Sequence, residues 1–285
     1  MTPLRQQMIE AMRLRGFSPR THHSYLGAVE QLARYYHCAP DRLSSAQLQA
    51  YFKYLALERG LSPASCRLYL NGVRFFYLNV LGWEEFAVSM VVPKRQQRIP
   101  VLLTRREVSR ILAACHNPKH RMLLETCYGC GLRVSELVSL RVSDIDGERK
   151  LLRIEQGKGA KDRHVIIAPS LLDRLRRYWR AQRPTHWLFP NQQRRARPLG
   201  VSTAQKIYHR AKAAAGVDKV GGIHALRHAY ATHQLENGLA VHQLQRLLGH
   251  SDLQSTLRYV HWVPSEHRES RGHADLIGHL GSNHG

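Results

Sequence analysis

Four separated stretches of the chain carry basic side chains, and the last of them also carries a tyrosine, that could act together on a phosphate ester. They are GCGLRVSEL with Arg133, EQGKGAKDR with Lys158, IHALRHAYATH with His224 and Arg227, and LLGHSDLQSTLRYV with His250 and Tyr259. A guanidinium group is a planar, two-pronged donor, so two arginines could clamp two non-bridging oxygens of one phosphate. A phenol is a poor nucleophile at its ordinary pKa of about 10, but nearby cations favour the phenolate and lower that pKa. These residue types could therefore break a phosphodiester through a tyrosine nucleophile without a metal.

The order of these residues resembles the tyrosine recombinases, the phage-integrase and Xer group. Members of that family carry Arg, Lys, His-x-x-Arg, Leu-Gly-His and a nucleophilic Tyr about nine residues after the last His, and this chain fills all six positions in that order. The resemblance spans nearly the whole chain, since the N-terminal helical part is similar to the family's core-binding domain. It implies a site-specific DNA recombinase, or integrase, in which Arg133 and Arg227 hold the phosphate and Tyr259 forms a 3′-phosphotyrosyl link.

The resemblance also assigns roles to the remaining three positions. Lys158, on a hairpin turn, would give a proton to the departing 5′ oxygen. His224 lies one helical turn before Arg227 and would take part in acid/base transfer with Tyr259, while His250 would hydrogen-bond the phosphate. Because the phosphotyrosyl bond conserves the energy of the broken phosphodiester, no ATP or other cofactor is implied, and the sequence contains no Walker motif.

Other polar side chains near these motifs have structural interpretations. Glu136 is expected to support Arg133 or the local helix and not to act as a base. His228 and His233 lie in the same stretch as His224, but no family role carries over to either. Both are predicted to be structural.

The five cysteines predict free thiols in a reducing compartment, because their number is odd and the chain shows no secretory signal. Cys127 and Cys130 form a C-x-x-C, but no second pair stands at zinc spacing and the surrounding stretch is apolar and helical. They are predicted to be small buried residues. The 18 histidines include no H-E-x-x-H and no carboxylate-rich cluster accompanies them, so no metal site is expected.

The charge of the chain predicts a polyanionic partner. Its 285 residues include 43 Lys and Arg against 21 Asp and Glu, a net charge of +22. No run approaches the roughly 20 apolar residues that a membrane-spanning helix needs, and the N-terminus lacks the apolar core of a signal peptide. Nucleic acid is therefore favoured over a membrane surface, and the family resemblance implies double-stranded DNA. The protein is expected to be soluble and cytoplasmic.

Helix-start signals predict four helices in residues 1–93. Ser18 and Ser62 are candidate N-caps, each followed by a proline at the first helical position. The basic segment 94–100, bracketed by prolines, is typical of an extended linker. Residues 1–100 carry 13 basic and 6 acidic residues, a net +7, and the remainder carry 30 and 15, a net +15, so one partner could contact both parts.

Residues 101–285 are predicted to form a mostly helical catalytic domain with a small antiparallel sheet. Thr104 and Glu107 would form a capping box at the start of its first helix. Two short β-type runs, KLLRIEQ and RHVIIAP, flank the Gly-rich GKGAKD and predict a hairpin, while the glycine- and histidine-rich C-terminal tail receives no assignment. The expected fold class is mainly α with a small antiparallel sheet (α+β): an N-terminal four-helix core-binding domain and a tyrosine-recombinase catalytic domain.

The leading interpretation is recombination by a homotetramer, or by paired protomers, assembled on two DNA sites. A type IB topoisomerase shares much of the chemistry but works as a monomer, and the compact N-terminal helical domain and the Xer-like motifs argue against it. A catalytically inactive DNA-binding regulator would be favoured by a lost Arg, Lys or Tyr, and none is lost. The 66 positions from Lys158 to His224 match the plain Xer or phage-type spacing and not the longer integron type.

Overall fold

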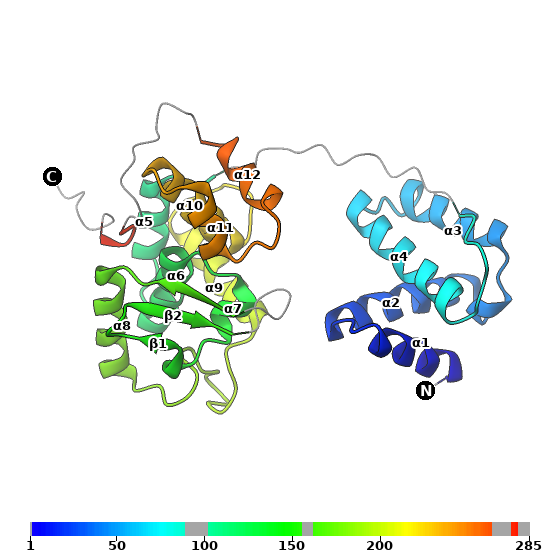
Figure 1. Cartoon of the computed structure of the whole chain (residues 1–285), viewed down its shortest axis with the longest axis horizontal. Helices are drawn as coiled ribbons and strands as arrows, with labels where there is room; N and C mark the ends of the chain where they lie inside the picture. The colour runs from blue at the N-terminus through cyan, green and yellow to red at the C-terminus, as the bar shows by residue number, and fades with distance from the viewer. Residues whose placement is uncertain (1, 89–101, 156–161, 264–274, 279–285) are drawn as a thin grey trace. The chain divides into compact units, whose positions relative to one another are not determined.

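The computed structural model describes residues 2–88, 102–155, 162–263 and 275–278. The chain divides into two compact units, Met1–Arg98 and Ile99–Gly285, each with a hydrophobic core of its own (Figure 1). The segment expected to be a linker, residues 94–100, lies outside the described residues.

Four α-helices and one short 3₁₀ helix form residues 2–88, the described part of the N-terminal unit, and this confirms the four helices expected there. Their bounds are α1 Pro3–Leu14, α2 Pro19–Tyr36, η1 Pro40–Arg42, α3 Ser45–Leu57 and α4 Pro63–Asn79. Helices α2 and α4 pack closely, since a Cβ built on Gly72 of α4 would lie 3.1 Å from the Cα atom of Tyr25. Leu32, Phe52 and Phe76 are fully buried in the core of this unit.

Side-chain caps determine where α2 and α4 begin. The Ser18 Oγ atom accepts a hydrogen bond from the Thr21 N–H group, and the Ser62 Oγ atom accepts one from the Ser65 N–H group, each at 3.2 Å. A proline follows each cap, where the missing N–H group would have had no partner within the helix. The two predicted N-caps are therefore confirmed.

Eight α-helices and a three-stranded sheet build the described part of the C-terminal unit. Their bounds are α5 Arg105–Ala113, α6 Pro118–Cys130, α7 Val134–Val138, η2 Val142–Asp144, β1 Ile145–Asp146, β2 Leu151–Ile154, β3 Arg163–Ile166, α8 Pro169–Gln182, α9 Val201–Ala214, α10 His224–Glu236, α11 Val241–Leu248 and α12 Gln254–Val260. Helix α6 is central, because all its residues from Met122 to Cys130 are buried and it contacts α5, α7, α8, α9 and α10. The predicted fold class is confirmed. Within the described ranges, no helix is long and apolar enough to cross a membrane.

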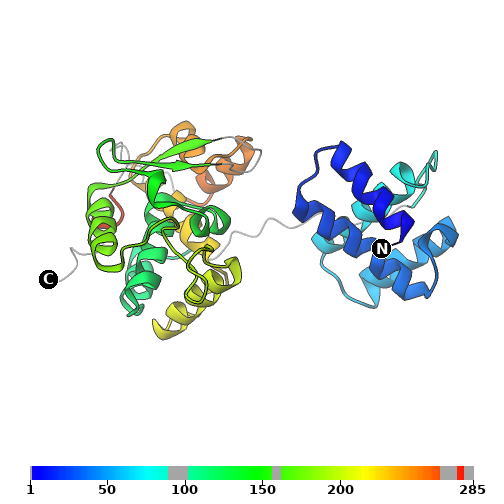
Figure 2. The same cartoon turned by 90° about the horizontal axis from the view of Figure 1, so that it is seen from below.

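The small sheet is antiparallel, with its strands in the order β1-β2-β3. Strands β2 and β3 pair Leu152 with Val165 and Ile154 with Arg163, which confirms the predicted hairpin strands. Strand β1 is only two residues long and was not predicted from the sequence. Figure 2 shows the sheet and α9 on opposite sides of this unit. The hairpin turn at residues 156–161, which includes Lys158, lies outside the described residues.

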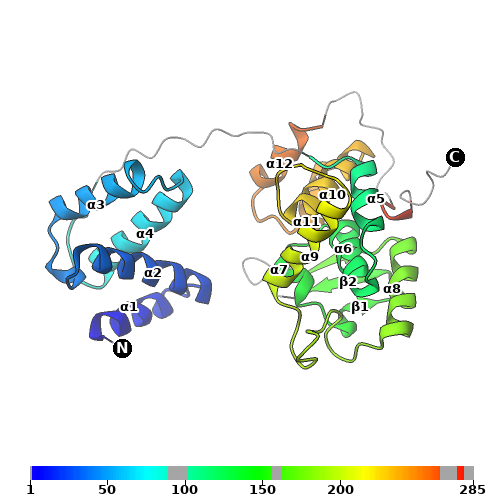
Figure 3. The ribbon, with the colours of Figure 1, turned by 180° about the vertical axis from the view of Figure 1, so that it is seen from behind.

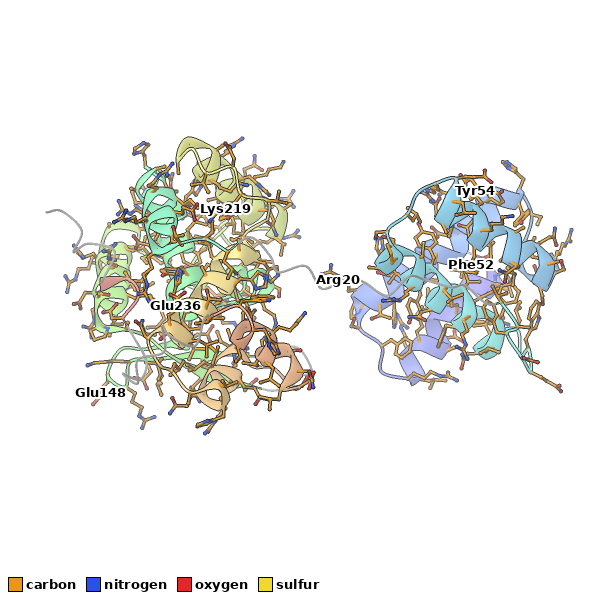
Figure 4. All side chains as sticks on the ribbon, turned by 90° about the horizontal axis from the view of Figure 1, so that it is seen from above. Arg20, Phe52, Tyr54, Glu148, Lys219 and Glu236 are labelled. Atoms are coloured by element: carbon orange, nitrogen blue, oxygen red, sulfur yellow. The ribbon has the colours of Figure 1, made fainter. Side chains whose placement is uncertain are left out.

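Polar contacts tie the first helix of the C-terminal unit to later parts of the chain. The Lys219 ammonium group donates to the Glu107 carboxylate at 2.6 Å, and Glu107 also closes the predicted capping box with Thr104. The Arg105 guanidinium group lies 3.7 Å from the carboxylate of Glu236. Figure 4 labels the two partner residues, Lys219 and Glu236. Helix α5 is thus anchored by charged partners that lie more than a hundred residues away in sequence.

A short piece of the C-terminal tail packs against the core of the same chain, although its composition gave no assignment. Leu276 and Ile277 are buried, and the missing side chain of Gly129 makes room for Ile277 on α6. The Asp275 carboxylate accepts a hydrogen bond from the Ser170 hydroxyl group at 2.6 Å. The Ser170 backbone N–H group donates to the same carboxylate at 3.3 Å, so two apolar side chains and two hydrogen bonds hold this piece in place.

The two cysteines of the C-x-x-C are buried free thiols on α6, as predicted. Burial raises the pKa of Cys127 and of Cys130 to about 12, so both stay protonated near neutral pH.

Candidate active site

Five of the six predicted site residues gather at one end of the C-terminal unit. Arg133 is the N-cap of α7, His224 and Arg227 lie on α10, His250 follows α11, and Tyr259 lies on α12. Figures 1 and 3 show α10, α11 and α12 grouped at the end of this unit that lies away from α8 and β1. The sixth residue, Lys158, lies outside the described residues.

Arg227 is the most firmly held member of the cluster. Its side chain is buried, and its guanidinium group donates to the carbonyl oxygen of Gly131 at 2.7 Å and to that of Leu248 at 2.8 Å. Gly131 has φ +60°, and a Cβ at this position would overlap the ring of Tyr230, so a glycine is required. Burial, followed by the charge of Arg133, lowers the pKa of Arg227 to about 10, which still leaves it charged at neutral pH.

Arg133 and Glu136 form a compact pair at the start of α7. The Arg133 Nη1 atom donates to Glu136 Oε1 at 2.7 Å, and the Arg133 backbone N–H group donates to Glu136 Oε2 at 2.9 Å. The Arg133 Nη2 atom also donates to the carbonyl oxygen of Gly249 at 3.1 Å. Arg133 thus joins α7 to the turn that carries His250, and Glu136 supports it as expected.

Arg163, at the start of β3, is a second partner of Glu136 that the sequence did not indicate. Its Nη1 and Nη2 atoms donate to the two carboxylate oxygens of Glu136 at 2.9 and 2.8 Å, and its Nε atom donates to the carbonyl oxygen of Leu247 at 3.0 Å. Burial alone would raise the pKa of Glu136, but the hydrogen bonds from Arg163 and Arg133 outweigh it and lower this pKa to about 2. Glu136 is therefore a charged anchor and not a proton acceptor.

His250 links the arginine cluster to α12. Its Nε2 atom lies 3.1 Å from Arg227 Nη2, and its Nδ1 atom lies 2.8 Å from the Thr256 hydroxyl group. Because a guanidinium group can only donate, Nε2 accepts from Arg227 and the Nδ1–H group donates to Thr256. Burial, followed by the charges of Arg227 and Arg133, lowers the pKa of His250 to about 4, which agrees with a neutral ring.

Tyr259 is buried, with only 5% of its surface exposed, and it is surrounded by aromatic rings. Its ring lies parallel to that of His250, with centroids 6.3 Å apart, and the Trp262 ring meets it edge-on at 5.1 Å. Its hydroxyl group lies 3.0 Å from the Nδ1 atom of His228. The phenol is thus held by ring contacts with His250 and Trp262 and by a hydrogen bond at its oxygen.

The expectation that neighbouring cations lower the pKa of Tyr259 is wrong for this structure. Burial raises that pKa, and the opposing charges of Arg227, Arg258 and Arg133 do not overcome it. The phenol therefore keeps its proton at neutral pH and can donate a hydrogen bond.

The three histidines of α10 have different surroundings. His224 is exposed at the start of the helix, with its ring centroid 6.5 Å from that of His228. His233 is buried and hydrogen-bonds the hydroxyl group of Tyr128 at 2.8 Å, which agrees with the structural role expected for it. His228, also expected to be structural, instead contacts the Tyr259 hydroxyl group. Its spacing of four residues from His224, which places both on one helix face, was the available signal.

The described side chains offer no group of three or more His, Cys, Asp or Glu that could hold a metal ion. The charges that could act on an anion here are guanidinium groups. Their hydrogen-bond partners are carbonyl oxygens, one carboxylate and one imidazole, so they are fixed in place before any anion binds.

Two family descriptions match the chain over most of its length. The Phage integrase family covers residues 102–266, and the Phage integrase, N-terminal SAM-like domain covers residues 4–85. The chain therefore belongs to the phage integrase family. It is a tyrosine recombinase, an enzyme that cleaves and rejoins DNA strands, and the family prediction is confirmed.

Individual proteins show the same likeness along nearly the full chain. The y4qK protein of Sinorhizobium fredii is 42% identical over 261 residues, which cover 91% of this chain and 84% of that protein. Tyrosine recombinase XerD of Pseudomonas putida is 33% identical over 281 residues, with 91% and 92% covered. The crystal structure of a lambda integrase(75-356) dimer bound to a COC′ core site has a TM-score of 0.71 at 20% identity, with 88% and 95% covered, and shows that the fold is shared.

Proposed function

We propose that this recombinase acts through a 3′-phosphotyrosyl intermediate on Tyr259. The observation that carries the proposal is the meeting of Tyr259, Arg227 and His250 within one chain. His250 hydrogen-bonds Arg227 and lies parallel to the Tyr259 ring, so the nucleophile and the phosphate-binding groups share one rigid frame. Arg133 joins that frame through the carbonyl oxygen of Gly249.

The proposed reaction uses these groups in one sequence. Arg133 and Arg227 bind the non-bridging oxygens of the scissile phosphate, and His250 adds a hydrogen bond. The Tyr259 oxygen attacks phosphorus, and the bond from phosphorus to the 5′ oxygen breaks. Lys158 gives that oxygen its proton, and His224, as the family resemblance implies, takes part in acid/base transfer. Rejoining reverses these steps, because a free 5′-hydroxyl group attacks the phosphotyrosyl bond.

The proposed partner is double-stranded DNA, held by both parts of the chain. Residues 1–93 would form the core-binding domain, 94–100 a basic linker and 101–285 the catalytic domain. The net charges of +7 on residues 1–100 and +15 on the remainder support a grip by both domains. A homotetramer on two recombination sites would bring four such nucleophiles together. The proposed location is the cytoplasm, and the five free cysteines fit such a reducing compartment.

A covalent-capture experiment tests the nucleophile. The full chain is incubated in EDTA with a nicked suicide duplex that carries its recombination site, and the protein–DNA adduct is isolated and mapped by peptide mass spectrometry. We expect the DNA on the peptide that contains Tyr259, and no adduct with Tyr259→Phe, which keeps the ring and loses one oxygen. Tyr178→Phe is the matched control, because its hydroxyl group also has a hydrogen-bond partner, at 3.1 Å, but lies on α8. An adduct on another tyrosine, or a need for a divalent metal, would contradict the proposal.

The same assay tests Lys158 through the leaving group. A bridging sulfur in place of the 5′ oxygen leaves without a proton, so Lys158→Ala should cleave that duplex at close to the wild-type rate while failing on the normal one. Equal impairment on both duplexes would assign the proton to another residue.

A further inference from the structure

The structure assigns a second histidine to the reaction: we propose that His228 holds the Tyr259 hydroxyl group and receives its proton when the phenol attacks phosphorus. This inference rests on the proposed role of Tyr259 as the nucleophile. It moves the task of proton acceptor from the exposed His224 to a residue that contacts the reacting oxygen.

The contact between the two side chains is direct and enclosed. The His228 Nδ1 atom lies 3.0 Å from the Tyr259 oxygen, and the two ring centroids are 5.7 Å apart. The indole of Trp262 packs edge-on against both rings, at 6.0 and 5.1 Å. Trp262 therefore fixes the pair as a unit, and the geometry of the hydrogen bond is already suitable for proton transfer.

The charges around His228 determine which atom carries the proton at rest. His224 and Arg227 lie on the same helix, and Arg258 lies on α12 beside Tyr259. Burial, followed by these neighbours, lowers the pKa of His228 to about 4, so the ring is neutral near pH 7. A neutral imidazole with its proton on Nε2 accepts at Nδ1, and in that tautomer the protonated phenol of Tyr259 donates to it, as the proposed transfer requires.

A bound phosphate would change this balance in favour of transfer. Burial and the neighbouring positive charges, that of Arg227 among them, make His228 a weak base, and the negative charge of a phosphate bound by Arg227 would offset the effect of those charges. The O–H bond of Tyr259 then breaks as the N–H bond of His228 forms, and the phenolate oxygen bonds to phosphorus as the 5′ oxygen departs. On rejoining, the imidazolium returns the proton to the departing phenolate, so protons balance over the cycle.

His224 differs from His228 in the features that a proton acceptor for Tyr259 needs. It is exposed, it lies one helical turn earlier on α10, and its ring centroid is 6.5 Å from that of His228. The histidine within hydrogen-bond distance of the Tyr259 oxygen is His228, whose Nδ1 atom lies 3.0 Å away. The acid/base role implied for His224 is therefore indirect with respect to the nucleophile in this arrangement.

Two variants separate proton transfer from positioning. His228→Ala removes the contact, whereas His228→Asn keeps an acceptor close to the position of Nδ1 but cannot take a proton. Single-turnover cleavage of the suicide duplex should fall by about 10²–10⁴-fold in both. His209→Ala, an exposed histidine on α9, is the control and should cleave like wild type.

A second substrate bypasses the nucleophile and reports on the rest of the site. A strand that ends in a 3′-(p-nitrophenyl phosphate) can be joined to a 5′-hydroxyl strand without Tyr259, because p-nitrophenolate leaves without a proton. Both His228 variants should join this substrate at rates within about threefold of wild type, which also shows that they fold and bind DNA. Arg227→Ala should lose both reactions, since its charge stabilises the phosphorane in each.

The outcomes distinguish the two proposals. If wild type forms no adduct, or Tyr259→Phe forms one, the proposed function fails and the inference fails with it. If wild type forms the Tyr259 adduct but His228→Ala cleaves at a similar rate, only the inference is overturned. If His228→Asn cleaves like wild type while His228→Ala does not, proton transfer to His228 is overturned. Loss of p-nitrophenyl joining in both His228 variants would also overturn it, because that reaction needs no phenol.

Discussion

Replacing Arg163 by methionine should destabilise the C-terminal unit by about 3–5 kcal/mol, the usual range for breaking a buried ion pair from one side. The Arg163 side chain is 10% exposed and that of Glu136 is 6% exposed, so water cannot replace the lost partner. The substitution removes both hydrogen bonds to the carboxylate and the one to the Leu247 carbonyl oxygen. Glu136 would keep its ion pair with Arg133, so the expected loss of unfolding free energy lies nearer the lower end of that range.

Arg153→Met on the neighbouring strand β2 is the matched control. Arg153 pairs with Glu155 at 3.0 Å and with Asp162 at 3.3 Å, but its side chain is 52% exposed. Exposed ion pairs contribute about 0–1 kcal/mol, so this variant should be nearly neutral.

The free energies come from urea unfolding of the full chain followed by tryptophan fluorescence, because three of its four tryptophans lie in the C-terminal unit. Hydrogen exchange should show faster amide opening in α7 and β3 for Arg163→Met. A double-mutant cycle with Glu136→Gln should give a coupling energy above about 1 kcal/mol. If Arg163→Met unfolds at the same urea concentration as Arg153→Met, the buried pair does not stabilise this unit and the reasoning is refuted.

Two further predictions concern Glu136 and Gly131, which hold the arginines of the site in place. The pKa of Glu136 is lowered to about 2 from its ordinary 4.5, so its charge should stabilise the fold by about 3 kcal/mol above pH 4.5, and this should be lost as the pH falls through about 2. The difference in unfolding free energy between wild type and Glu136→Gln should therefore shrink with falling pH, and a constant difference would contradict the shift. Gly131→Ala should cost more than about 2 kcal/mol, because it combines φ +60° with an overlap on the Tyr230 ring. Gly147→Ala, where the nearest atom would lie 3.6 Å from the new Cβ, should cost less in the same thermal unfolding assay.

The helices could be predicted because their start signals act locally. Ser18 and Ser62 cap the N–H groups three residues later, and Thr104 with Glu107 does the same for α5. Such a signal needs no knowledge of the rest of the fold. The order of the motif residues could also be recognised in the sequence. That order identifies the residue types of the site, but it does not predict which atoms contact one another.

The contacts of Arg163 could not be predicted, because they depend on packing across the chain. Its partners are 27 and 84 positions away in sequence, and no periodic pattern connects them. The tail was missed for a similar reason, since the site that receives Ile277 exists only because Gly129 of α6 has no side chain there. The pKa of Tyr259 was predicted in the wrong direction because the sequence shows nearby cations but not the burial that outweighs them.

The charge balance of the cluster indicates how a buried, protonated phenol can still react. Three guanidinium groups, those of Arg133, Arg163 and Arg227, surround the single carboxylate of Glu136, at 2.7, 2.8 and 3.9 Å, which leaves an excess of two positive charges. A phosphodiester carries one negative charge, and its pentacoordinate transition state carries two. The fixed excess therefore matches the transition state more closely than the substrate, which is the condition for catalysis by preorganised charge. In the proposed reaction, Glu136 fixes the arginines without cancelling their charge, and the remaining positive charge stabilises the negative charge that develops on the phosphate as the Tyr259 oxygen bonds to phosphorus.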